Sequence, residues 1–533
     1  MTSAPDETRE QPPREGSPHE ARAATRVGAG IFASRVLGFV RERVFAHYFG
    51  SSDFADAWRA ALRMPNVVQN LLGEGTLSAS LIPVYAELLE EGRDEDARRF
   101  AGAALGILSA VAGTLALAGY VLAPLLVGLF FPLWDSPKQE LTTLLVRILF
   151  PMTGVLVLSA WALGILNSHR RFFVSYVAPV FWNLAMIAAM VGGAVYLGLE
   201  PGSRSLVVAL AWGALVGGGL QLAWQLPFVL PLLGGLRLSV GRGVTGVQEA
   251  VRNFWPVVAA RGVVNLSGWI DLILAGLLAS GAVAVLGYAQ TFYLLPISLF
   301  GMSIAASELP ELSRMREEAE RVVAARVSRA LRRVSFFLIP STLAYLALGD
   351  VIVSALFETG EFGAAESLVT WGVLAAYALG LPASGSSRVL SSAFYALRDT
   401  KTPARIAGLR VVISAGVGIA LMFPADRLGF ETLRLGAAGL AMGASAGAWI
   451  EYVLLRRALG RRLGTHGPGR MPVAKVAVAA ALATAVAVAL QLVLPPAHPI
   501  VLATETLVPF GVVFLAAAAL LGEGGLRTRP RGA

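Results

Sequence analysis

The chain has 533 residues, of which 56% are hydrophobic and 15% are charged, and its mean hydropathy is +0.65. This composition excludes a soluble globular protein and is typical of helical proteins that cross a membrane many times, whereas the strict alternation of a membrane β-barrel is absent. The formal net charge is +9, but the basic residues lie in loops between apolar segments, which favours a topological role over nucleic-acid binding.

Several kinds of chemical site are not indicated by the sequence. There is no cysteine, so neither disulfides nor thiolate chemistry are available. The five histidines are scattered without metal-ligand spacing, and no Walker A motif suggests direct use of ATP. No carboxylate pair or metal constellation is apparent in the outer loops. We therefore expect no cofactor, no metal and no enzymatic activity.

In chain order, residues 1–24 are rich in Pro, Glu and Arg and are predicted to be a disordered tail rather than a signal peptide. Fourteen apolar segments follow, several longer than the ~20 residues that span a bilayer. Pro65, Pro83, Pro296 and Pro382 are predicted to kink their helices. The expected helices cover residues 27–49, 54–90, 98–131, 139–168, 172–198, 204–231, 254–279, 282–313, 326–349, 365–398, 403–424, 434–458, 472–494 and 499–522.

The distribution of Lys and Arg predicts the orientation of these helices. With the N-terminus in the cytoplasm, twenty-three Lys and Arg residues fall in inner loops and four in outer loops. Positive loops stay inside, so both termini are expected in the cytoplasm and the number of spans is expected to be even. The expected location is the bacterial cytoplasmic (inner) membrane.

A weak internal repeat suggests how the helices are grouped. The segment 77–87 has a counterpart at 302–314, and the loop 167–172 has one at 397–403. Copies that start on the same side of the membrane are parallel repeats, and such halves enclose a central cavity. The predicted fold is thus an all-α polytopic membrane protein with about fourteen helices. Its expected parts are a tail at 1–25, lobes at 26–232 and 233–460, a peripheral helix pair at 461–524 and a tail at 525–533.

The first apolar segment carries Arg35, Arg41 and Arg43. A cation at bilayer depth costs at least ~2.5–3.5 kcal/mol and is tolerated where it faces a bundle interior or a wet cavity. Arg35 and Arg41 are about 240° apart around an ideal helix. A break at Gly38 would bring both onto one cavity wall, whereas Arg43 is expected nearer the outer interface.

Six short motifs carry a family resemblance: Ser-Arg-Val-Leu-Gly-Phe-Val-Arg at 34–41, Ala-Asp-Ala-Trp at 55–58, Met-Pro-Asn at 64–66, Gly-Glu-Gly at 73–75, Ile-Pro-Val-Tyr-Ala-Glu at 82–87 and Asp-Thr-Lys-Thr-Pro at 399–403. In these motifs the chain resembles the MurJ (MviN) family. The resemblance extends over residues 26–524. It implies the fourteen-helix MOP flippase fold and the flipping of lipid II, an undecaprenyl-pyrophosphate-linked peptidoglycan precursor. It also implies a monomer that contacts membrane lipids, with cell-wall synthesis proteins as candidate partners.

The resemblance also implies site residues. Arg35 and Arg41 match cavity arginines that would bind the pyrophosphate, and Asp56 and Glu74 match acidic positions on the second helix. Asp56 could alternatively cap that helix or pair with Arg41 or Arg59, and Glu74 is expected to pair with a cavity arginine. The remaining expected site residues are Arg63 and Arg388, as cavity cations, and Asp271, a weak candidate ion site for which an ion pair with Arg261 or Arg410 is favoured.

Three positions depart from the family pattern. Gln69 and Thr291 stand where arginines are expected, and Leu294 stands where an acidic residue is expected. Other arginines could substitute for them, or transport could be lost. The departures keep two alternatives open: a flippase for another polyprenyl-linked oligosaccharide, and a non-transporting scaffold for envelope assembly.

Overall fold

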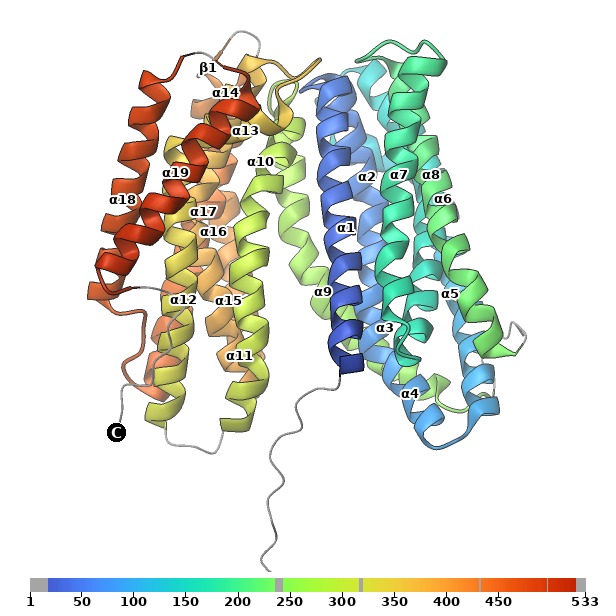
Figure 1. The fold of residues 1–533 in the computed structure, drawn as a ribbon. Coiled ribbons are helices and arrows are strands. Elements are labelled where there is room, and N and C mark those ends of the chain that lie inside the picture. The colour runs from blue at the N-terminus through green and yellow to red at the C-terminus, as the bar shows by residue number, and fades with distance from the viewer. Residues whose placement is uncertain (1–17, 235–242, 316–319, 431–432, 496, 524–533) are drawn as a thin grey trace, which may run out of the picture.

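A computed structural model describes residues 18–234, 243–315, 320–430, 433–495 and 497–523, and these residues are almost entirely helical (Figure 1). The N-terminal part forms α1 (Pro18–Phe49), α2 (Asp53–Leu72), α3 (Glu74–Ser80), α4 (Ile82–Glu90), α5 (Asp94–Phe130), α6 (Ser136–Ser168), α7 (Phe172–Tyr196) and α8 (Arg204–Leu233). The rest forms α9 (Val247–Ala275), α10 (Ala282–Pro296), a π-helical turn (Ile297–Met302), α11 (Ser303–Arg314), α12 (Glu320–Ala347), α13 (Gly349–Phe357), α14 (Ala364–Ala378), α15 (Leu381–Ala396), α16 (Lys401–Asp426), the short strands β1 (Gly429–Phe430) and β2 (Leu433–Arg434), α17 (Gly436–Leu463), α18 (Arg470–Val493) and α19 (Pro499–Leu520).

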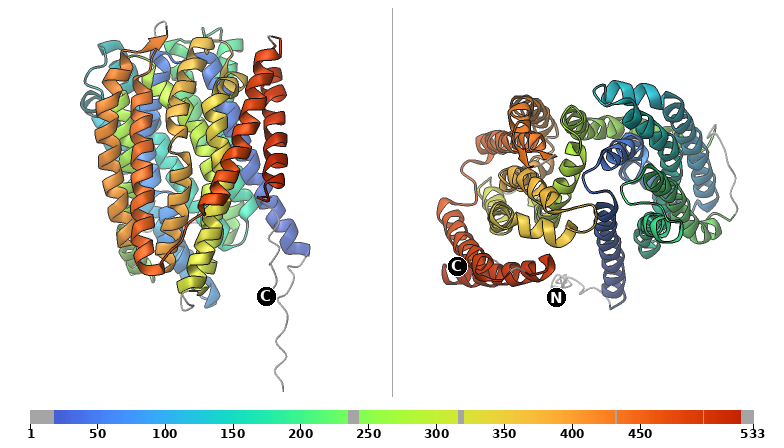
Figure 2. Two further views of the ribbon diagram at one scale, coloured as in Figure 1. Left: turned by 90° about the vertical axis from the view of Figure 1, so that its left-hand side faces the viewer. Right: turned by 90° about the horizontal axis from the view of Figure 1, so that it is seen from above.

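The helices form two bundles (Figures 1 and 2). We call α1–α8 the first bundle and α10–α17 the second bundle. Helix α9 lies between them and contacts α2 and α3 on one side and α16 and α17 on the other. The pair α18–α19 lies outside and packs on α12, where Phe514 contacts Phe336 at a ring-centroid distance of 5.2 Å. Because the helices form two bundles, a ligand-binding site is expected at the interface between them.

The fourteen predicted segments correspond to fourteen helical stretches separated by turns. Among the described residues, nine helices are long and apolar enough to cross a membrane, and two bent helix pairs raise this number to eleven. The stretches that do not meet this test are α1, α2–α4 and α9. These three carry charged residues or breaks within the span, and they line the site described below.

Three of the four predicted proline kinks coincide with helix breaks. Pro83 lies in the first turn of α4, Pro382 lies in the first turn of α15 at a 43° bend, and Pro296 ends α10 before the π-helical turn. Pro65 lies inside α2, which runs through it without interruption, so the kink predicted there stays a prediction. The break that was not predicted is at Gly73, where a Cβ atom would collide with the Gln69 carbonyl, so the close approach there requires glycine.

Two expectations about α1 are wrong. The helix begins at Pro18, inside the predicted disordered tail, because proline suits a first helical position and residues 19–26 are mostly helix formers. The helix also passes through Gly38 without a break, so Arg35 and Arg41 stay on different faces. Residues 1–17 and 524–533, which include the predicted tail at 525–533, lie outside the described residues.

The signature at 399–403 has a local structural role. The Asp399 carboxylate accepts hydrogen bonds from the backbone N–H (2.9 Å) and hydroxyl (2.7 Å) of Thr402, at the start of α16. It also accepts one from Arg462 of α17 at 2.6 Å. These bonds, those from Thr402 first, lower the pKa of Asp399 below its ordinary value of 3.8. The motif therefore starts α16 and ties it to α17.

We expect Asp399→Ala to destabilise the protein by about 1 kcal/mol at neutral pH, as for loss of a helix cap. A carboxyl with a lowered pKa stabilises the fold above the pKa of the unfolded chain and loses that effect as pH falls. The difference in melting temperature between wild type and variant should thus be full at pH 7 and shrink below the ordinary value of 3.8. Asp135→Ala is the control, because Asp135 makes no side-chain cap bond at α6; a difference that persists at low pH would contradict this role.

Candidate functional site

A cavity of about 160 Å³ lies between the bundles, near the middle of α2. Its walls come from α1 and α2 on one side and from α9 and α10 on the other. Charged, polar and apolar side chains all contribute. The lining residues are Arg41, Glu42, Trp58, Arg59, Leu62, Arg63, Asn66, Gly268, Leu272, Val283, Leu286, Gly287 and Gln290.

Arg41 is held at this cavity by three neighbours. Its Nη1 donates to Asn183 Oδ1 of α7 at 3.1 Å, and its Nη2 donates to Glu42 Oε1 at 2.7 Å. The guanidinium also stacks on Trp182, 5.2 Å from the ring centroid. Its side chain remains 21% exposed, so the planar fork is oriented yet accessible from the cavity.

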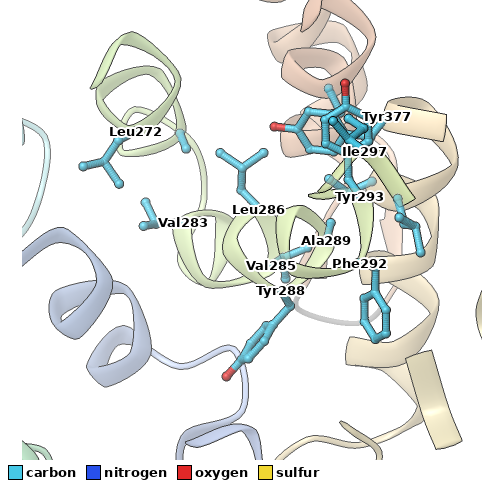
Figure 3. Close-up of a cluster of buried hydrophobic side chains, with 14 of the residues drawn as sticks. Leu272, Val283, Val285, Leu286, Tyr288, Ala289, Phe292, Tyr293, Ile297 and Tyr377 are labelled. Atoms are coloured by element: carbon cyan, nitrogen blue, oxygen red, sulfur yellow. The ribbon is translucent and has the colours of Figure 1, made fainter. Parts of the chain in front are cut away.

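Glu42 and Arg59 complete an ion-paired cluster. Arg59 Nη2 donates to Glu42 Oε2 at 3.0 Å, so this carboxylate bridges two arginines. The Arg59 guanidinium lies over Tyr288 at 4.3 Å and over Phe45 at 5.3 Å. Tyr288 points from α10 toward the first bundle (Figure 3) and donates its hydroxyl proton to the carbonyl of Gly50 at 2.8 Å. Arg59 is thus fixed between the two bundles.

Arg63 extends the cationic surface one turn further along α2. Its guanidinium lies directly against Gly268 of α9, where no side chain larger than hydrogen fits without moving it. Asp271, one turn along α9, interacts electrostatically with both Arg63 and Arg410. The expected ion pair between Asp271 and Arg410 is not formed, because Arg410 pairs with Glu451 of α17 at 2.8 Å. The side chain of Arg261 lies outside the described set.

The cavity therefore carries a surplus of positive charge. Among its described lining residues, three arginines face one carboxylate. Arginine binds phosphate oxygens bidentately and keeps its charge when partly desolvated. A doubly anionic group is the ligand that such a wall suits best.

Asp56 lies elsewhere than the cavity. It is 1% exposed and accepts from Lys138 Nζ of α6 and from the backbone N–H groups of Gly281 and Ala284, each at 2.8 Å. The alternatives considered for Asp56 are therefore wrong: Ser52 caps α2, and Asp56 instead caps α10 of the second bundle. Its pairing cation is Lys138 rather than Arg41 or Arg59.

Asp56 is one part of a hydrogen-bonded seam that joins the bundles on one side. We call the side where α1 ends and α2 begins the closed side (top of Figure 1). Ser280 donates to Asp53 (2.6 Å) and Trp134 donates to the Gly276 carbonyl (3.0 Å). Arg43 donates to two carbonyls at the end of α13, at 2.9 and 2.6 Å. All hydrogen bonds between the bundles found among the described residues lie on this side.

The other predicted site residues are not all brought together. Arg35 is exposed on α1 and Arg388 is exposed on α15, and neither lines the cavity. Thr291 lies on α10, where its hydroxyl donates to the Gly287 carbonyl of its own helix at 3.0 Å. The side chain of Glu74 lies outside the described set. The structure thus places Arg41 and Arg63 at one cavity, with Asp56 at the neighbouring seam.

Three residues of this region were missed as site residues from the sequence: Glu42, Lys138 and Arg59, which was considered only as a partner of Asp56. Glu42 lies in the same apolar segment as the arginines. Because a carboxylate in the hydrocarbon core is costly in free energy, its position indicates a cationic partner. Lys138 was assigned only to an outer loop. It stands in the first turn of α6, where the helix dipole disfavours a cation, and this pattern indicates a nearby carboxylate.

The fold, two bundles of helices with a cavity between them, is similar to that of solved membrane transporters, among them one of the MOP superfamily. An inward-facing multidrug transporter of the MATE family in that superfamily matches with a TM-score of 0.65 at 16% identity, covering 83% of this chain and 98% of that chain. A structure titled lipid II flippase MurJ, inward closed conformation, matches with a TM-score of 0.77 at 23% identity, covering 94% and 99%.

The particular family follows from sequence. The family described as lipid II flippase MurJ matches residues 45–508. A probable lipid II flippase MurJ of Rhizobium tropici is 32% identical, covering 82% of this chain and 80% of that protein. The lipid II flippase MurJ of Burkholderia cenocepacia is 31% identical, covering 84% and 85%. The chain belongs to the MurJ family of lipid II flippases, which confirms the resemblance seen in its motifs.

Proposed function

We propose that this chain moves lipid II from the inner to the outer leaflet of the cytoplasmic membrane by alternating access. The observation that carries the proposal is the surplus of arginine in a cavity between two bundles of membrane-spanning helices. The pyrophosphate of the substrate would bind Arg41, Arg59 and Arg63. The polyprenyl tail would stay in the bilayer while the charged head group passes between the bundles.

The physical chemistry of the substrate supports this assignment. An anionic head group cannot cross hydrocarbon unaided, because moving an ion out of water costs many kcal/mol without compensating partners. Arginine forks supply charge-assisted hydrogen bonds to phosphate oxygens that replace those of water. Glu42 pairs with Arg41 and Arg59, which keeps the two cations compensated.

The hydrogen-bonded seam supports a cycle of alternating access. With both termini in the cytoplasm, as the Lys and Arg distribution predicts, the closed side faces outward and this conformation would receive substrate from the cytoplasm. Breaking the seam formed by Asp56, Lys138 and the start of α10 would open the outward side. Membrane potential or an ion gradient would drive the cycle, and Asp271 is the weak candidate for binding an ion.

Growth rescue tests the proposal. Bacteria depleted of their own lipid II flippase should grow when they express this protein, and their lipid II should reach the outer leaflet. Failure of the well-expressed protein to restore either readout would overturn the proposed function.

A second candidate function is the flipping of another polyprenyl-pyrophosphate-linked oligosaccharide. Gln69 and Thr291, which replace two expected cations with neutral groups, favour this alternative. Comparison of purified-protein affinities for lipid II and for polyprenyl-linked sugars without a peptide would separate the two functions. A preference for lipid II would count against the alternative.

A further inference from the structure

A second cavity of about 650 Å³ adjoins the arginine-lined cavity and lies inside the first bundle. Asn66 lines both cavities. The second cavity is walled by α2 and α3 and by α6, α7 and α8. Its volume lies in the range of ordinary small-molecule sites. Its polar and aromatic lining side chains are Asn66, Gln69, Asn70, Ser159, Gln221 and Trp182.

The described side chains that line this second cavity are polar or apolar, and none of them is charged. None of its described lining residues is Lys, Arg, Asp or Glu. Each amide side chain offers two N–H donors and a carbonyl acceptor. Such groups can bind hydroxyl and acetamido groups, which both donate and accept, whereas a phosphate would lack a cation here. Trp182 adds an aromatic face against which an apolar sugar face can pack.

A buried hydrogen-bond chain orients one wall of the cavity. Gln221 Nε2 donates to Ser159 Oγ at 3.0 Å, and Ser159 donates to Gln225 Oε1 at 2.8 Å. Gln225 is fully buried, yet its Nε2 has no hydrogen-bond partner among the described residues. Buried amide donors are satisfied in most folded proteins. Gln225 itself does not line the cavity. The chain therefore holds the Gln221 side chain in place at this wall.

We propose that this second cavity, which we call the amide pocket, binds the first sugar of the lipid-linked substrate. The inference rests on the proposed function and adds a specificity site to it. In a polyprenyl-pyrophosphate glycan the first sugar is bonded directly to the pyrophosphate. Arg41, which would hold the pyrophosphate, stacks on Trp182 of the amide pocket. One substrate can therefore fill both cavities, with Asn66 at the junction.

The test compares two ligands on the purified full-length protein by native mass spectrometry: lipid II and undecaprenyl pyrophosphate without sugar. Gln69→Met and Gln221→Met keep side-chain size and remove the amide. Each should weaken lipid II binding roughly 3- to 10-fold, as for loss of about one hydrogen bond, and leave undecaprenyl pyrophosphate binding unchanged. The matched control is Gln248→Met, since Gln248 is exposed on α9 and lines neither cavity.

The outcomes separate the two proposals. Gln69 does not belong to the hydrogen-bond chain Gln221–Ser159–Gln225. Gln69→Met therefore tests sugar binding in the amide pocket even if Gln221→Met perturbs folding. Variants that weaken both ligands equally, or neither, would overturn the assignment of the amide pocket to the sugar. Arg41→Gln should weaken both ligands, and if it weakens neither, the proposed pyrophosphate site itself is wrong.

Discussion

Arg41→Gln is expected to abolish rescue of cells depleted of their own lipid II flippase. The substitution removes the fork that Asn183 and Trp182 hold at the cavity. Charge-assisted hydrogen bonds contribute about 1.5–3 kcal/mol each. Loss of one such bond should therefore lower the affinity for the pyrophosphate roughly 10- to 100-fold. The measurement is growth rescue at matched protein level in the membrane. Arg41→Lys should rescue only in part, because it keeps the charge but loses the fork.

Arg147→Gln serves as the matched control for this variant. Arg147 is an arginine of α6 that contacts Tyr120 of α5 and does not line the cavity. It should rescue like wild type. Full rescue by Arg41→Gln at wild-type protein level would show that this arginine is not needed for transport.

Asp56→Ala is expected to have the largest effect on stability, about 3–5 kcal/mol in the free energy of unfolding. The carboxylate is buried against Lys138, and its removal leaves that cation with Asp53 alone and the start of α10 uncapped. Asp53→Ala should cost below about 1 kcal/mol, because the Asp53 side chain is 55% exposed and water screens its ion pair.

Thermal unfolding of the two variants in detergent measures this contrast. Lys138→Met in the Asp56→Ala background should recover part of the loss, because it removes the under-compensated buried cation. Equal melting temperatures for Asp56→Ala and Asp53→Ala would show that the seam does not depend on the buried carboxylate. The same seam joins the bundles on the closed side. The free energy that its contacts contribute therefore also opposes the opening of that side.

Much of the fold could be predicted from the sequence because apolar length determines where a helix can span a bilayer. The fourteen predicted segments follow the helices of the structure closely. The predictions did not locate the break at Gly73, and they placed a kink at Pro296 without predicting the π-helical turn that follows it. These breaks depend on backbone contacts and on packing against neighbouring helices, and hydropathy does not report them.

The site was predictable only where a charge conflicts with its apolar surroundings. Arg41 was identified this way, and the same reasoning applied to Glu42 would have identified its partner. By contrast, the distinction between Arg35, which is exposed, and Arg41, which lines the cavity, depends on how α1 packs against α7 and α2. The partnership of Asp56 with α10 joins residues more than 200 positions apart, and a single sequence carries no signal for it.

The family pattern identified the function class but not the chemistry particular to this chain. Gln69 could be read from sequence only as a missing cation. In the structure it lines the amide pocket, whose described lining residues carry no charge, beside the arginine-lined cavity. This arrangement concentrates the positive charge on Arg41, Arg59 and Arg63, so these three should carry the anion affinity of the protein.

The binding of undecaprenyl pyrophosphate relative to undecaprenol tests the central claim most directly, because the two lipids differ only in the head group. The purified wild-type protein should bind undecaprenyl pyrophosphate much more tightly than undecaprenol. A quadruple variant in which Arg41, Arg59, Arg63 and Glu42 are all replaced by glutamine should lose that preference. Equal binding of both lipids by the wild type, or a preference that survives in the quadruple variant, would contradict the assignment of this cavity to the pyrophosphate.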